Sequence, residues 1–361
     1  MSQPIYVTQP SLAPIPELAA LLEQPWQSGI LTHNGPLVLR LERELSAYFK
    51  VSDLVTIING TCAMQLAIRA LDLTGEIITT PFTFIATANI IAWERCTPVF
   101  VDIDPATWNI DAAKIEAAIT PRTSAILPVH VFSAPCDVLR IDAIAKQHRL
   151  RVIYDAAHAT AVDCGGQSLM NYGDVSCLSF HATKLFNTAE GGGCVSRDPA
   201  LMARIRRLRF FGFDEQKEIT DEGMNAKMTE VHAALGLVNL KYLDQVRANR
   251  RRKYGQYVSL LADVPFVTFQ KYNPEEYNYS YMPVLFDSEE RLQRVVKSLA
   301  TDRIVPRRYF HPSMHELPKF GPAPKLPVAE QVSRCILCLP LYDTLATESI
   351  EQVCRLVRKA G

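Results

Sequence analysis

The chain contains the run Ser179-Phe-His-Ala-Thr-Lys184-Leu-Phe-Asn-Thr-Ala-Glu-Gly-Gly-Gly193, and about thirty residues before this lysine the apolar stretch Arg151-Val-Ile-Tyr154 ends in Asp155. Both pieces place a reactive side chain shortly after a pattern that is typical of a buried strand. A lysine amine and a distant carboxylate are the groups that a protein supplies to hold pyridoxal phosphate, because the amine condenses with the aldehyde and the carboxylate keeps the ring nitrogen protonated. Lys184 and Asp155 are therefore a candidate catalytic pair.

Outward from these two pieces, short apolar runs alternate with longer helical patterns. The β-branched runs predict strands at Val55 to Ile58, Glu76 to Thr79, Pro98 to Val101, Ser124 to Val131, Arg151 to Tyr154, Val175 to Phe180 and Gly193 to Ser196. The stretches between several of them predict helices at Cys62 to Leu71, Phe84 to Trp93 and Leu139 to His148. The alternation predicts an α/β fold with a mostly parallel mixed sheet flanked by helices, in which ligands bind at the carboxyl ends of the strands.

The pattern changes beyond the last of these strands. A basic helical stretch covers Leu201 to Phe211, and a long helical pattern covers Met228 to Arg252. From Val264 onward, short strands and helices return with many prolines. We therefore predict two domains, an N-terminal arm and large domain over residues 1–245 and a smaller α+β domain over residues 246–361.

The long helical pattern ends in a basic cluster, Arg247-Ala-Asn-Arg-Arg-Arg-Lys253. Such a cluster occurs at nucleic-acid interfaces and also at the solvated end of a helix that joins two domains. The second interpretation is favoured because no aromatic side chains are interleaved at stacking spacing.

The composition is that of a soluble enzyme of moderate size. Of the 361 residues, 48% are hydrophobic, which is enough for a substantial core. Lys and Arg number 38, as do Asp and Glu, so the formal charge of zero favours neither nucleic acid nor a membrane surface as a partner. The longest apolar run, Ile77 to Trp93, is broken by Pro81 and Asn89 and is too interrupted for a membrane helix. The start of the sequence does not resemble an export signal, so we expect a cytoplasmic protein.

Nine cysteines are scattered without a regular framework, which suits a reducing compartment. Cys335 and Cys338 form a close pair of the C-x-x-C type, which can bind zinc or act in redox chemistry. No second pair or histidine cluster completes four ligands, and the flanking Ile336, Leu337 and Leu339 predict a buried strand. We therefore expect no metal site.

The triplet Asn59-Gly60-Thr61 follows the first predicted strand and opens a helical pattern. A glycine at such a turn lets backbone amides approach a ligand, and a helix start presents N–H groups to an anion. The same triplet is also an ordinary turn followed by a helix cap. Both interpretations, phosphate binding and capping, are open.

Six blocks stand in order along nearly the whole chain: Asn59-Gly-Thr61, Thr80-Pro-Phe-Thr-Phe84, Val101-Asp-Ile-Asp104, Asp155-Ala-Ala-His158, Ser179-Phe-x-x-x-Lys184 with Glu190-Gly-Gly192, and Gly223-Met-Asn225. In this order they resemble the DegT/StrS family of sugar-nucleotide aminotransferases, which are fold-type-I enzymes dependent on pyridoxal phosphate. The ordered set is more specific than any one block. The resemblance implies the fold-type-I large domain, a smaller C-terminal domain and pyridoxal 5'-phosphate as the cofactor.

The resemblance also implies catalytic roles for three residues. Lys184 matches the lysine that bonds to the cofactor and moves a proton between cofactor and substrate, and its amine is suited to this because it lies beside the reacting carbon once released. Asp155 matches the partner of the ring nitrogen, although aspartate at a strand end is often a helix cap. His158 matches a residue near the cofactor's phenolic oxygen, although a single histidine is more often structural.

Other positions match the family's cofactor contacts. Phe84 matches the aromatic residue that stacks on the pyridine ring, although alone it would be a core residue. The phosphate cradle matches four positions: Gly60, Thr61, Cys62 and Ser179. Asn225 matches a residue that reaches the phosphate from the neighbouring subunit, so the resemblance implies a homodimer with shared active sites.

Two positions depart from the family pattern. Cys62 stands where small or hydroxyl residues are more usual. Lys227 stands where an arginine commonly follows the Gly-x-Asn block, and lysine keeps the charge but lacks the bidentate fork. Neither change touches the groups that carry the cofactor chemistry.

The substrates that the resemblance implies are L-glutamate, which leaves as 2-oxoglutarate, and a nucleotide-linked keto sugar. Thr32 and Asn34 in the loop Gly29 to Gly35, together with Tyr309 and His311, match places that line the sugar and nucleotide. The wording of this loop and of the Lys184 run looks most like family members that convert dTDP-4-keto-6-deoxyglucose to dTDP-4-amino-4,6-dideoxyglucose. Amination at carbon 3, by a 3-keto sugar-nucleotide aminotransferase, would use the same motifs, because a small change in how the hexose lies decides the carbon.

Two alternatives come from other functional classes. A non-catalytic regulator can keep the same fold, and its sign would be the loss of Lys184 or Asp155, which are both present. A different reaction of the same cofactor, such as decarboxylation or aldol cleavage, is disfavoured by the sugar-nucleotide blocks. Some relatives carry histidine in place of the lysine and deoxygenate sugars, but this chain keeps lysine.

Overall fold

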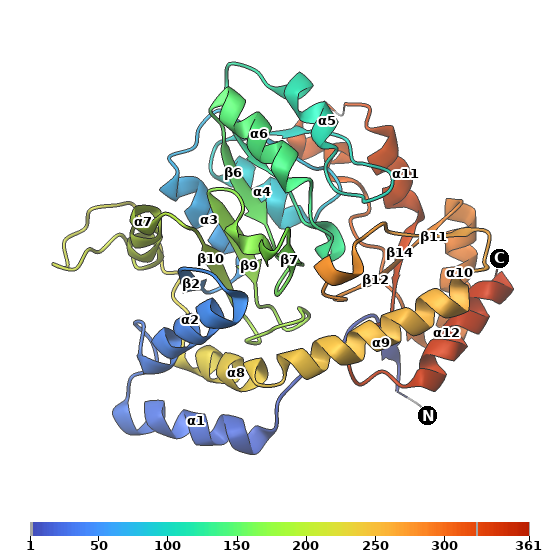
Figure 1. Cartoon of the computed structure of the whole chain (residues 1–361), viewed down its shortest axis with the longest axis horizontal. Coiled ribbons are helices and arrows are strands. Elements are labelled where there is room, and N and C mark those ends of the chain that lie inside the picture. Colours follow the sequence, from blue (N-terminus) through green and yellow to red (C-terminus); the bar gives the residue numbers. More distant parts are fainter. Residues whose placement is uncertain (1–2, 323, 361) are drawn as a thin grey trace.

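The computed structural model describes residues 3–322 and 324–360. In this part of the chain, a seven-stranded sheet with the strand order β2-β10-β9-β6-β5-β3-β4 forms the centre of the fold (Figure 1). Its strands are β2 (Leu54–Ile57), β3 (Glu76–Thr79), β4 (Thr97–Phe100), β5 (Thr123–Leu127), β6 (Arg151–Asp155), β9 (Val175–Ser179) and β10 (Gly192–Val195). Strand β10 is antiparallel to β2 and β9, whereas the other neighbouring strands are parallel. The predicted α/β fold with a mostly parallel mixed sheet is confirmed.

The strands closely follow the predicted runs except at one end. The run predicted to extend from Ser124 to Val131 stops at Leu127, because Pro128 has no N–H to continue a ladder. The chain then forms a short 3-10 turn, Val131–Ser133, in which Phe132 has a φ of 53°. This turn brings Phe132 to the carboxyl edge of the sheet, next to His158.

Successive side chains of each strand pack into two different cores, because strand side chains alternate between the faces of a sheet. In β6, Val152 and Tyr154 belong to one core and Ile153 belongs to the other. The first core is completed by helices α2 (Pro36–Phe49), α6 (Val138–His148) and α8 (Glu230–Leu240). The second core is completed by α3 (Gly60–Ala70), α4 (Ile85–Trp93) and α7 (Pro199–Arg209). Helices therefore cover both faces, as predicted.

The remaining helices lie outside these two cores or at their edges. Helix α1 (Ile15–Ser28) packs along α8, and α5 (Ala112–Ile115) is a short turn near α6. The C-terminal part has a three-stranded antiparallel sheet of β11 (Val267–Phe269), β12 (Met282–Phe286) and β14 (Ile336–Leu339). Its own core includes residues of α9 (Leu243–Leu261), α10 (Glu289–Thr301) and α12 (Thr347–Ala360), and α11 (Pro327–Cys335) leads into β14.

The first strand crosses to this C-terminal part. Strand β1 (Ile5–Tyr6) pairs in parallel with β13 (Ile304–Val305), and Ile5 packs against the C-terminal core. The first residues of the region that we assign to the large domain therefore lie on the C-terminal part. The division at residues 245 and 246 stays a prediction.

The long helical pattern from Met228 to Arg252 is two helices, so the prediction of one helix was wrong. Helix α8 ends at Leu240, and α9 begins at Leu243. Between them the backbone tightens, with the Tyr242 N–H donating to the carbonyl of Asn239. The Asn239 side chain is occupied by the N-terminal arm, because its oxygen accepts from the Ala13 N–H at 2.9 Å. The break therefore lies where the N-terminal arm contacts the helix pair.

The prediction that the basic cluster is the solvated end of a helix was wrong about the helix end and only partly right about solvation, since Arg251 and Arg252 are exposed. It lies in the middle of α9, which crosses from the large unit to the C-terminal part (Figure 1). Arg250 is fully buried and donates to the carbonyl of Ser280 at 3.1 Å. Lys253 is buried too and donates to the carbonyl of Asp343. These two cations hold the C-terminal part together, because backbone carbonyls there accept their hydrogen bonds.

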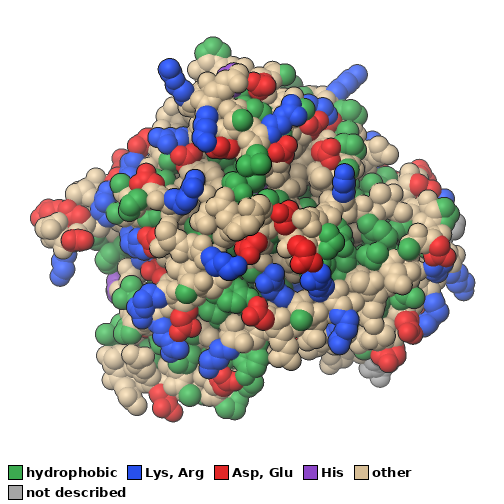
Figure 2. All heavy atoms as spheres, viewed as in Figure 1, with side chains coloured by type: hydrophobic (Ala, Val, Ile, Leu, Met, Phe, Trp, Pro, Cys, Tyr) green, Lys and Arg blue, Asp and Glu red, His purple; other side chains and the backbone are tan. Residues whose placement is uncertain are grey.

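The cysteine pair spans the junction of α11 and β14 in the C-terminal part. Cys335 ends α11 and Cys338 lies in β14, where both thiols are buried and free, so the predicted buried strand is confirmed. Across the surface, basic and acidic side chains are interspersed on the face that Figure 2 shows. None of the helices in residues 3–322 and 324–360 has both the length and the apolar character needed to cross a bilayer.

Candidate active site

A cavity of about 370 Å³ opens at the carboxyl ends of the central strands. Its wall carries the residues that follow β2, β6 and β9, as expected for a doubly covered parallel sheet. Eight of the predicted site residues line it: Gly60, Thr61, Phe84, Asp155, His158, Ser179, Lys184 and Tyr309. The structure thus brings the catalytic candidates into one space.

Lys184 lies on a loop between the adjacent strands β9 and β10. The Phe180 N–H donates to the carbonyl of Gly191, and the Thr188 N–H donates to the carbonyl of Phe180, so the loop is closed at its base. Gly192 lets this base lie against the start of α3, because a Cβ there would be 2.5 Å from the Asn59 carbonyl carbon. The glycine run therefore allows the lysine loop and the predicted phosphate turn to be neighbours.

The environment of Lys184 favours a neutral amine. Removal from water lowers the pKa of Lys184 to about 8, the negative charge of Asp155 opposes this shift, and the positive charge of Arg307 adds to it. The Nζ atom donates a hydrogen bond to the Tyr281 hydroxyl at 3.2 Å. Because the neutral amine is the nucleophile, a pKa near neutrality keeps a usable fraction of this lysine reactive.

Asp155 ends β6 inside the cavity wall. Its two carboxylate oxygens accept hydrogen bonds from the Thr87 hydroxyl at 2.8 Å and from the Ala157 N–H at 3.1 Å. Burial raises the pKa of Asp155, whereas these hydrogen bonds and the charge of Lys184 oppose the rise. A buried carboxylate of this kind gains from a cation placed beside it. The Ala157 contact is a local cap, so Asp155 combines the capping geometry with a position on the cavity wall.

His158 lies against aromatic rings on the same wall. Its Nδ1 atom accepts from the Phe132 N–H at 3.2 Å, so the neutral ring carries its proton on Nε2. Burial lowers the pKa of His158 well below its usual value, and the charge of Lys184 lowers it further. The ring stacks near Phe132 at 6.0 Å and meets Tyr281 at 4.5 Å. His158 is therefore a fixed, neutral hydrogen-bond donor.

The start of α3 forms one end of the cavity. The Asn59 side chain accepts from the Cys62 N–H at 2.8 Å, so the triplet does contain a helix cap. Gly60 and Thr61 in the first turn line the cavity, whereas Cys62 is absent from the described lining. A Cβ on Gly60 would lie 3.0 Å from the Cβ of Ser179, which shows how closely the two walls approach. The capping and phosphate-binding interpretations are compatible, because the cap uses the N–H of Cys62, whereas Gly60 and Thr61 are the residues of this turn that line the cavity.

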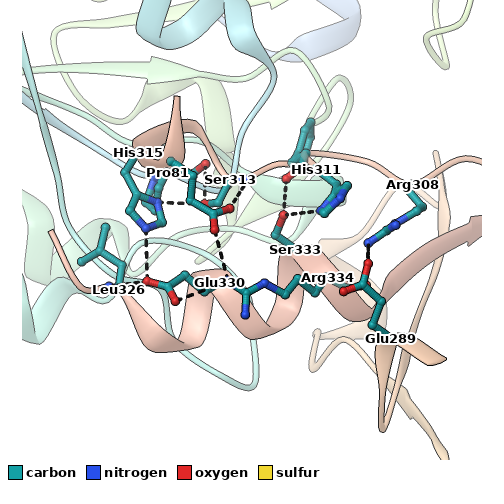
Figure 3. A network of polar contacts seen from close by, with 12 residues as sticks. Pro81, Glu289, Arg308, His311, Ser313, His315, Leu326, Glu330, Ser333 and Arg334 are labelled. Carbon is teal, nitrogen blue, oxygen red and sulfur yellow. Dashed lines mark hydrogen bonds and ion pairs between the residues drawn. The ribbon is translucent and has the colours of Figure 1, made fainter. Parts of the chain in front are cut away.

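A segment of the C-terminal part closes the cavity on its other side. Figure 3 shows how polar contacts fix it: the Ser313 hydroxyl donates to the Pro81 carbonyl at 3.3 Å, and His315 bridges Ser313 and Glu330 at 3.1 and 3.4 Å. These residue types are those of a hydrolase triad, but Ser313 is fully buried and out of reach of a substrate. Tyr309, which precedes this network in the sequence, lines the cavity.

Besides Cys62, four predicted contacts are absent from the described lining of this cavity: Thr32, Asn34, Asn225 and His311. Asn225 is exposed, and its side-chain oxygen accepts from Lys227 at 2.5 Å. His311 is exposed, and its Nδ1 atom lies 3.5 Å from the Ser333 hydroxyl. Phe84 does line the cavity and is 52% exposed, so it is a mouth residue and not part of the core.

Sequence reasoning missed three residues of this site. Thr87 holds Asp155, and its signal was a hydroxyl in an otherwise apolar helical pattern. Tyr281 contacts Lys184, but nothing in the sequence connects two residues so far apart. Arg307 lines the cavity with its guanidinium 4.8 Å from the ring centre of Tyr309, and it forms no ion pair with a carboxylate in the part of the chain that the structure describes.

Pyridoxal phosphate fits this set of groups. Its aldehyde needs an amine, its ring nitrogen a carboxylate and its phenolic oxygen a neutral N–H donor, which Lys184, Asp155 and His158 supply. Its phosphate needs a helix start, where N–H groups lack partners within the helix, and α3 supplies one. The cavity volume lies in the range of small-molecule sites.

Comparison with known proteins agrees with this chemistry. The model of the DegT/DnrJ/EryC1/StrS aminotransferase family matches residues 15–358. The dTDP-4-amino-4,6-dideoxy-D-glucose transaminase of Shigella dysenteriae is 39% identical, over 99% of this chain and 100% of its own. The solved structure of DesI with its TDP-sugar product has a TM-score of 0.95 and 36% identity, over 99% of this chain and 93% of its own. NtdA of Bacillus subtilis, solved with the cofactor PMP, has a TM-score of 0.89 and 27% identity, over 96% of this chain and 81% of its own. The chain therefore belongs to the DegT/DnrJ/EryC1/StrS aminotransferase family, whose cofactor is pyridoxal phosphate.

Proposed function

We propose that the protein transfers the amino group of L-glutamate to dTDP-4-keto-6-deoxyglucose and so makes dTDP-4-amino-4,6-dideoxyglucose. The observation that carries the reaction type is the placement of the Lys184 amine and the Asp155 carboxylate on the wall of one cavity. The choice of sugar is supported by the Shigella dysenteriae relative, whose name states this product, and by DesI, which was solved with a TDP-sugar product.

Lys184 and Asp155 divide the proton chemistry. When bound, the cofactor supplies an electron-accepting ring that makes the carbon next to the amino nitrogen acidic. The Lys184 amine, neutral above a pKa of about 8, would take the proton from this carbon and deliver it to the cofactor carbon on the other side of the amino nitrogen. Asp155 faces the ring nitrogen and keeps it protonated, because a buried carboxylate is stabilised by an adjacent positive charge.

Three further groups hold the ring and its phosphate. His158 donates from Nε2 to the phenolic oxygen, since its Nδ1 is already occupied by the Phe132 N–H. Phe84 covers one face of the ring and excludes water from it. Gly60, Thr61 and Ser179 line the end of the cavity that would receive the phosphate.

Arg307 binds a carboxylate of glutamate. Among the described lining residues it supplies the guanidinium group, and a guanidinium matches a carboxylate through two parallel hydrogen bonds. It lies close enough to lower the pKa of Lys184, so an anion bound there is near the reacting amine. The two substrates share this space in turn, since the donor leaves as 2-oxoglutarate before the keto sugar enters.

Two chains form the complete site. Asn225 lies outside the described lining of its own cavity, which is the position expected of a residue that serves the phosphate of a neighbouring subunit. Thr32, Asn34 and His311 then contact the sugar nucleotide around the mouth, together with Tyr309. In each chain, residues 1–245 form the arm and large domain and residues 246–361 the small domain.

The test is to incubate the purified protein with L-glutamate and a panel of keto sugar nucleotides and to locate the new nitrogen by NMR. We expect nitrogen on carbon 4 of the dTDP sugar, with 2-oxoglutarate released in equal amount. Lys184→Ala abolishes transfer, whereas Lys146→Ala, an exposed lysine on α6, leaves it unchanged. Nitrogen on carbon 3, or transfer by Lys184→Ala, would contradict the proposal.

A further inference from the structure

The amine of Lys184 has a hydrogen-bond partner that belongs to none of the sequence blocks around the cofactor. Its Nζ atom donates to the Tyr281 hydroxyl at 3.2 Å. Tyr281 is 6% exposed and lies directly before β12, in the C-terminal part of the chain. The reactive end of the lysine is therefore in contact with the C-terminal part, whereas its backbone belongs to the central sheet.

The ring of Tyr281 is fixed by its neighbours. It meets His158 at 4.5 Å and Tyr309 at 5.3 Å, measured between ring centres, so it fills the space between two other residues of the cavity wall. Phe132 packs against it at 5.5 Å. A ring held on three sides leaves its hydroxyl one direction, which is toward Lys184.

The backbone on either side of this ring is fixed as well. Arg250, which is fully buried, donates to the carbonyl of Ser280 at 3.1 Å. The Asn278 side chain donates to the carbonyls of His158 and Thr160, both at 2.8 Å, and accepts from the Ser280 N–H at 3.0 Å. The segment is thus attached to α9 on one side and to the His158 loop on the other. Such doubly supported side chains hold the reacting geometry of an active site.

We propose that Tyr281 is a positioning residue for Lys184. The Tyr281 hydroxyl accepts a hydrogen bond from the Lys184 amine and holds this amine where it exchanges a proton with the substrate carbon. The role rests on the proposed function, because it concerns the proton transfer that this function requires. The tyrosine itself neither gains nor loses a proton: burial raises its pKa far above neutrality, so it remains a neutral phenol throughout. With the cofactor bound, the Lys184 nitrogen would take the proton from the substrate carbon and deliver it to the cofactor carbon on the other side of the amino nitrogen.

The matched pair of variants is Tyr281→Phe and Tyr257→Phe. Tyr281→Phe keeps the ring and its contacts with His158 and removes the acceptor of the amine. Tyr257 is also fully buried, but its hydroxyl has no hydrogen-bond partner among the described residues, so Tyr257→Phe controls for the loss of a buried hydroxyl as such. Equal thermal unfolding temperatures and equal cofactor content establish that both variants fold.

Two readouts separate positioning from other roles. In steady state with the cofactor-loaded enzyme, Tyr281→Phe lowers kcat by roughly ten- to a hundredfold and leaves KM for both substrates unchanged, because misplacement by about an ångström affects the chemical step. In the full-length protein without cofactor, the pH midpoint for linkage of added pyridoxal phosphate to Lys184 moves below that of wild type. The direction follows because a hydrogen bond from the ammonium form favours the charged lysine, and the variant lacks it.

The outcomes are distinct. Lower kcat together with a lower pH midpoint, with Tyr257→Phe like wild type, supports the positioning role. A Tyr281→Phe enzyme with wild-type kcat and midpoint would overturn it while leaving the proposed function intact. A raised KM for glutamate with unchanged kcat would overturn it too, since it would make Tyr281 a substrate-binding residue. Wild-type protein without any amino transfer from glutamate would overturn the proposed function itself.

Discussion

At the scale of single residues, the site depends on the state of one amine. Lys184 is half-buried on the cavity wall, with Asp155 and Arg307 exerting opposite effects on its charge. A lysine in water would be almost entirely protonated at neutral pH, and a protonated amine cannot attack an aldehyde. The loss of hydration in the cavity is therefore the largest contribution of the fold to the reactivity of this residue.

This environment predicts how the protein without cofactor takes up pyridoxal phosphate. Because the pKa of Lys184 is lowered to about 8, the neutral amine forms as the pH rises through 8, and linkage accelerates there and levels off above it. The measurement is the rate of absorbance change on mixing, at a series of pH values. As a control, the same rates are measured for a small alkyl amine mixed with pyridoxal phosphate, which shows how the cofactor's own titration affects the pH dependence. A midpoint near that of an exposed lysine would contradict the prediction.

Residue roles show how far sequence alone can reach. The placement of Lys184 and Asp155 in one cavity was predictable because both follow predicted strands, and parallel strands bring their carboxyl ends together, whereas His158 was predicted from the family resemblance. Tyr281 and Arg307 were not predictable, because they come from the C-terminal part and reach the site through tertiary packing.

At the scale of elements, one helix start is held by a distant carboxylate. Both oxygens of Glu230, the first residue of α8, accept from the start of α2: from Leu37 N–H at 2.8 Å and from Val38 N–H at 2.9 Å. The Glu230 N–H in turn donates to the carbonyl of Leu31 at 3.0 Å. The loop that carries Thr32 and Asn34 is thereby attached to α8. Negative charge at a helix start is also favoured by the helix dipole.

Glu230→Gln tests this attachment. The amide nitrogen cannot accept a hydrogen bond, so one buried N–H loses its partner, and we expect a loss of about 1 to 3 kcal/mol in the free energy of unfolding. The KM for the sugar nucleotide rises as the loop loosens, whereas the KM for glutamate does not. Urea unfolding and steady-state kinetics measure the two effects. The control is Glu44→Gln, whose exposed pair with Arg40 contributes less than about 1 kcal/mol. Equal urea midpoints for Glu230→Gln and wild type would show that the cap is dispensable.

The bounds of the strands and helices show which of them local sequence patterns could predict. Strands β2 and β3 follow their predicted runs because both are buried along their whole length, where apolar and β-branched residues are favoured. The break between α8 and α9 was missed, because the helical pattern of the sequence runs through it without interruption. Arg250 was expected in solvent because the Ser280 carbonyl that accepts its hydrogen bond lies thirty positions further along the sequence.

At the scale of the whole molecule, the proposed shared site makes a prediction about mixed dimers. Lys184→Ala and Asn225→Asp are each inactive or nearly so, the second because a carboxylate repels the phosphate. In a dimer that carries one of each, one site has Lys184 from one chain and Asn225 from its partner. A one-to-one mixture of exchanged subunits therefore recovers about a quarter of the wild-type activity.

The control for this experiment uses two residues of the same wall. Lys184 and Asp155 line one cavity within one chain, so Lys184→Ala mixed with Asp155→Asn yields no complete site and no recovery. Light scattering establishes the mass of each preparation. Activity of the Lys184→Ala and Asn225→Asp mixture that does not exceed the sum of its parents would count against a shared site.

The route of the chain has a consequence for dissecting the molecule. The first described strand, β1, pairs with β13 of the C-terminal part; from there the backbone passes along the arm to the central sheet and returns through α9. Two separate strings of backbone thus tie the lobes together. If a protease cuts one of these two connections, the other still joins the two parts of the molecule. If the gene is divided after α8, the N-terminal fragment keeps β1, whose pairing partner β13 lies in the C-terminal fragment.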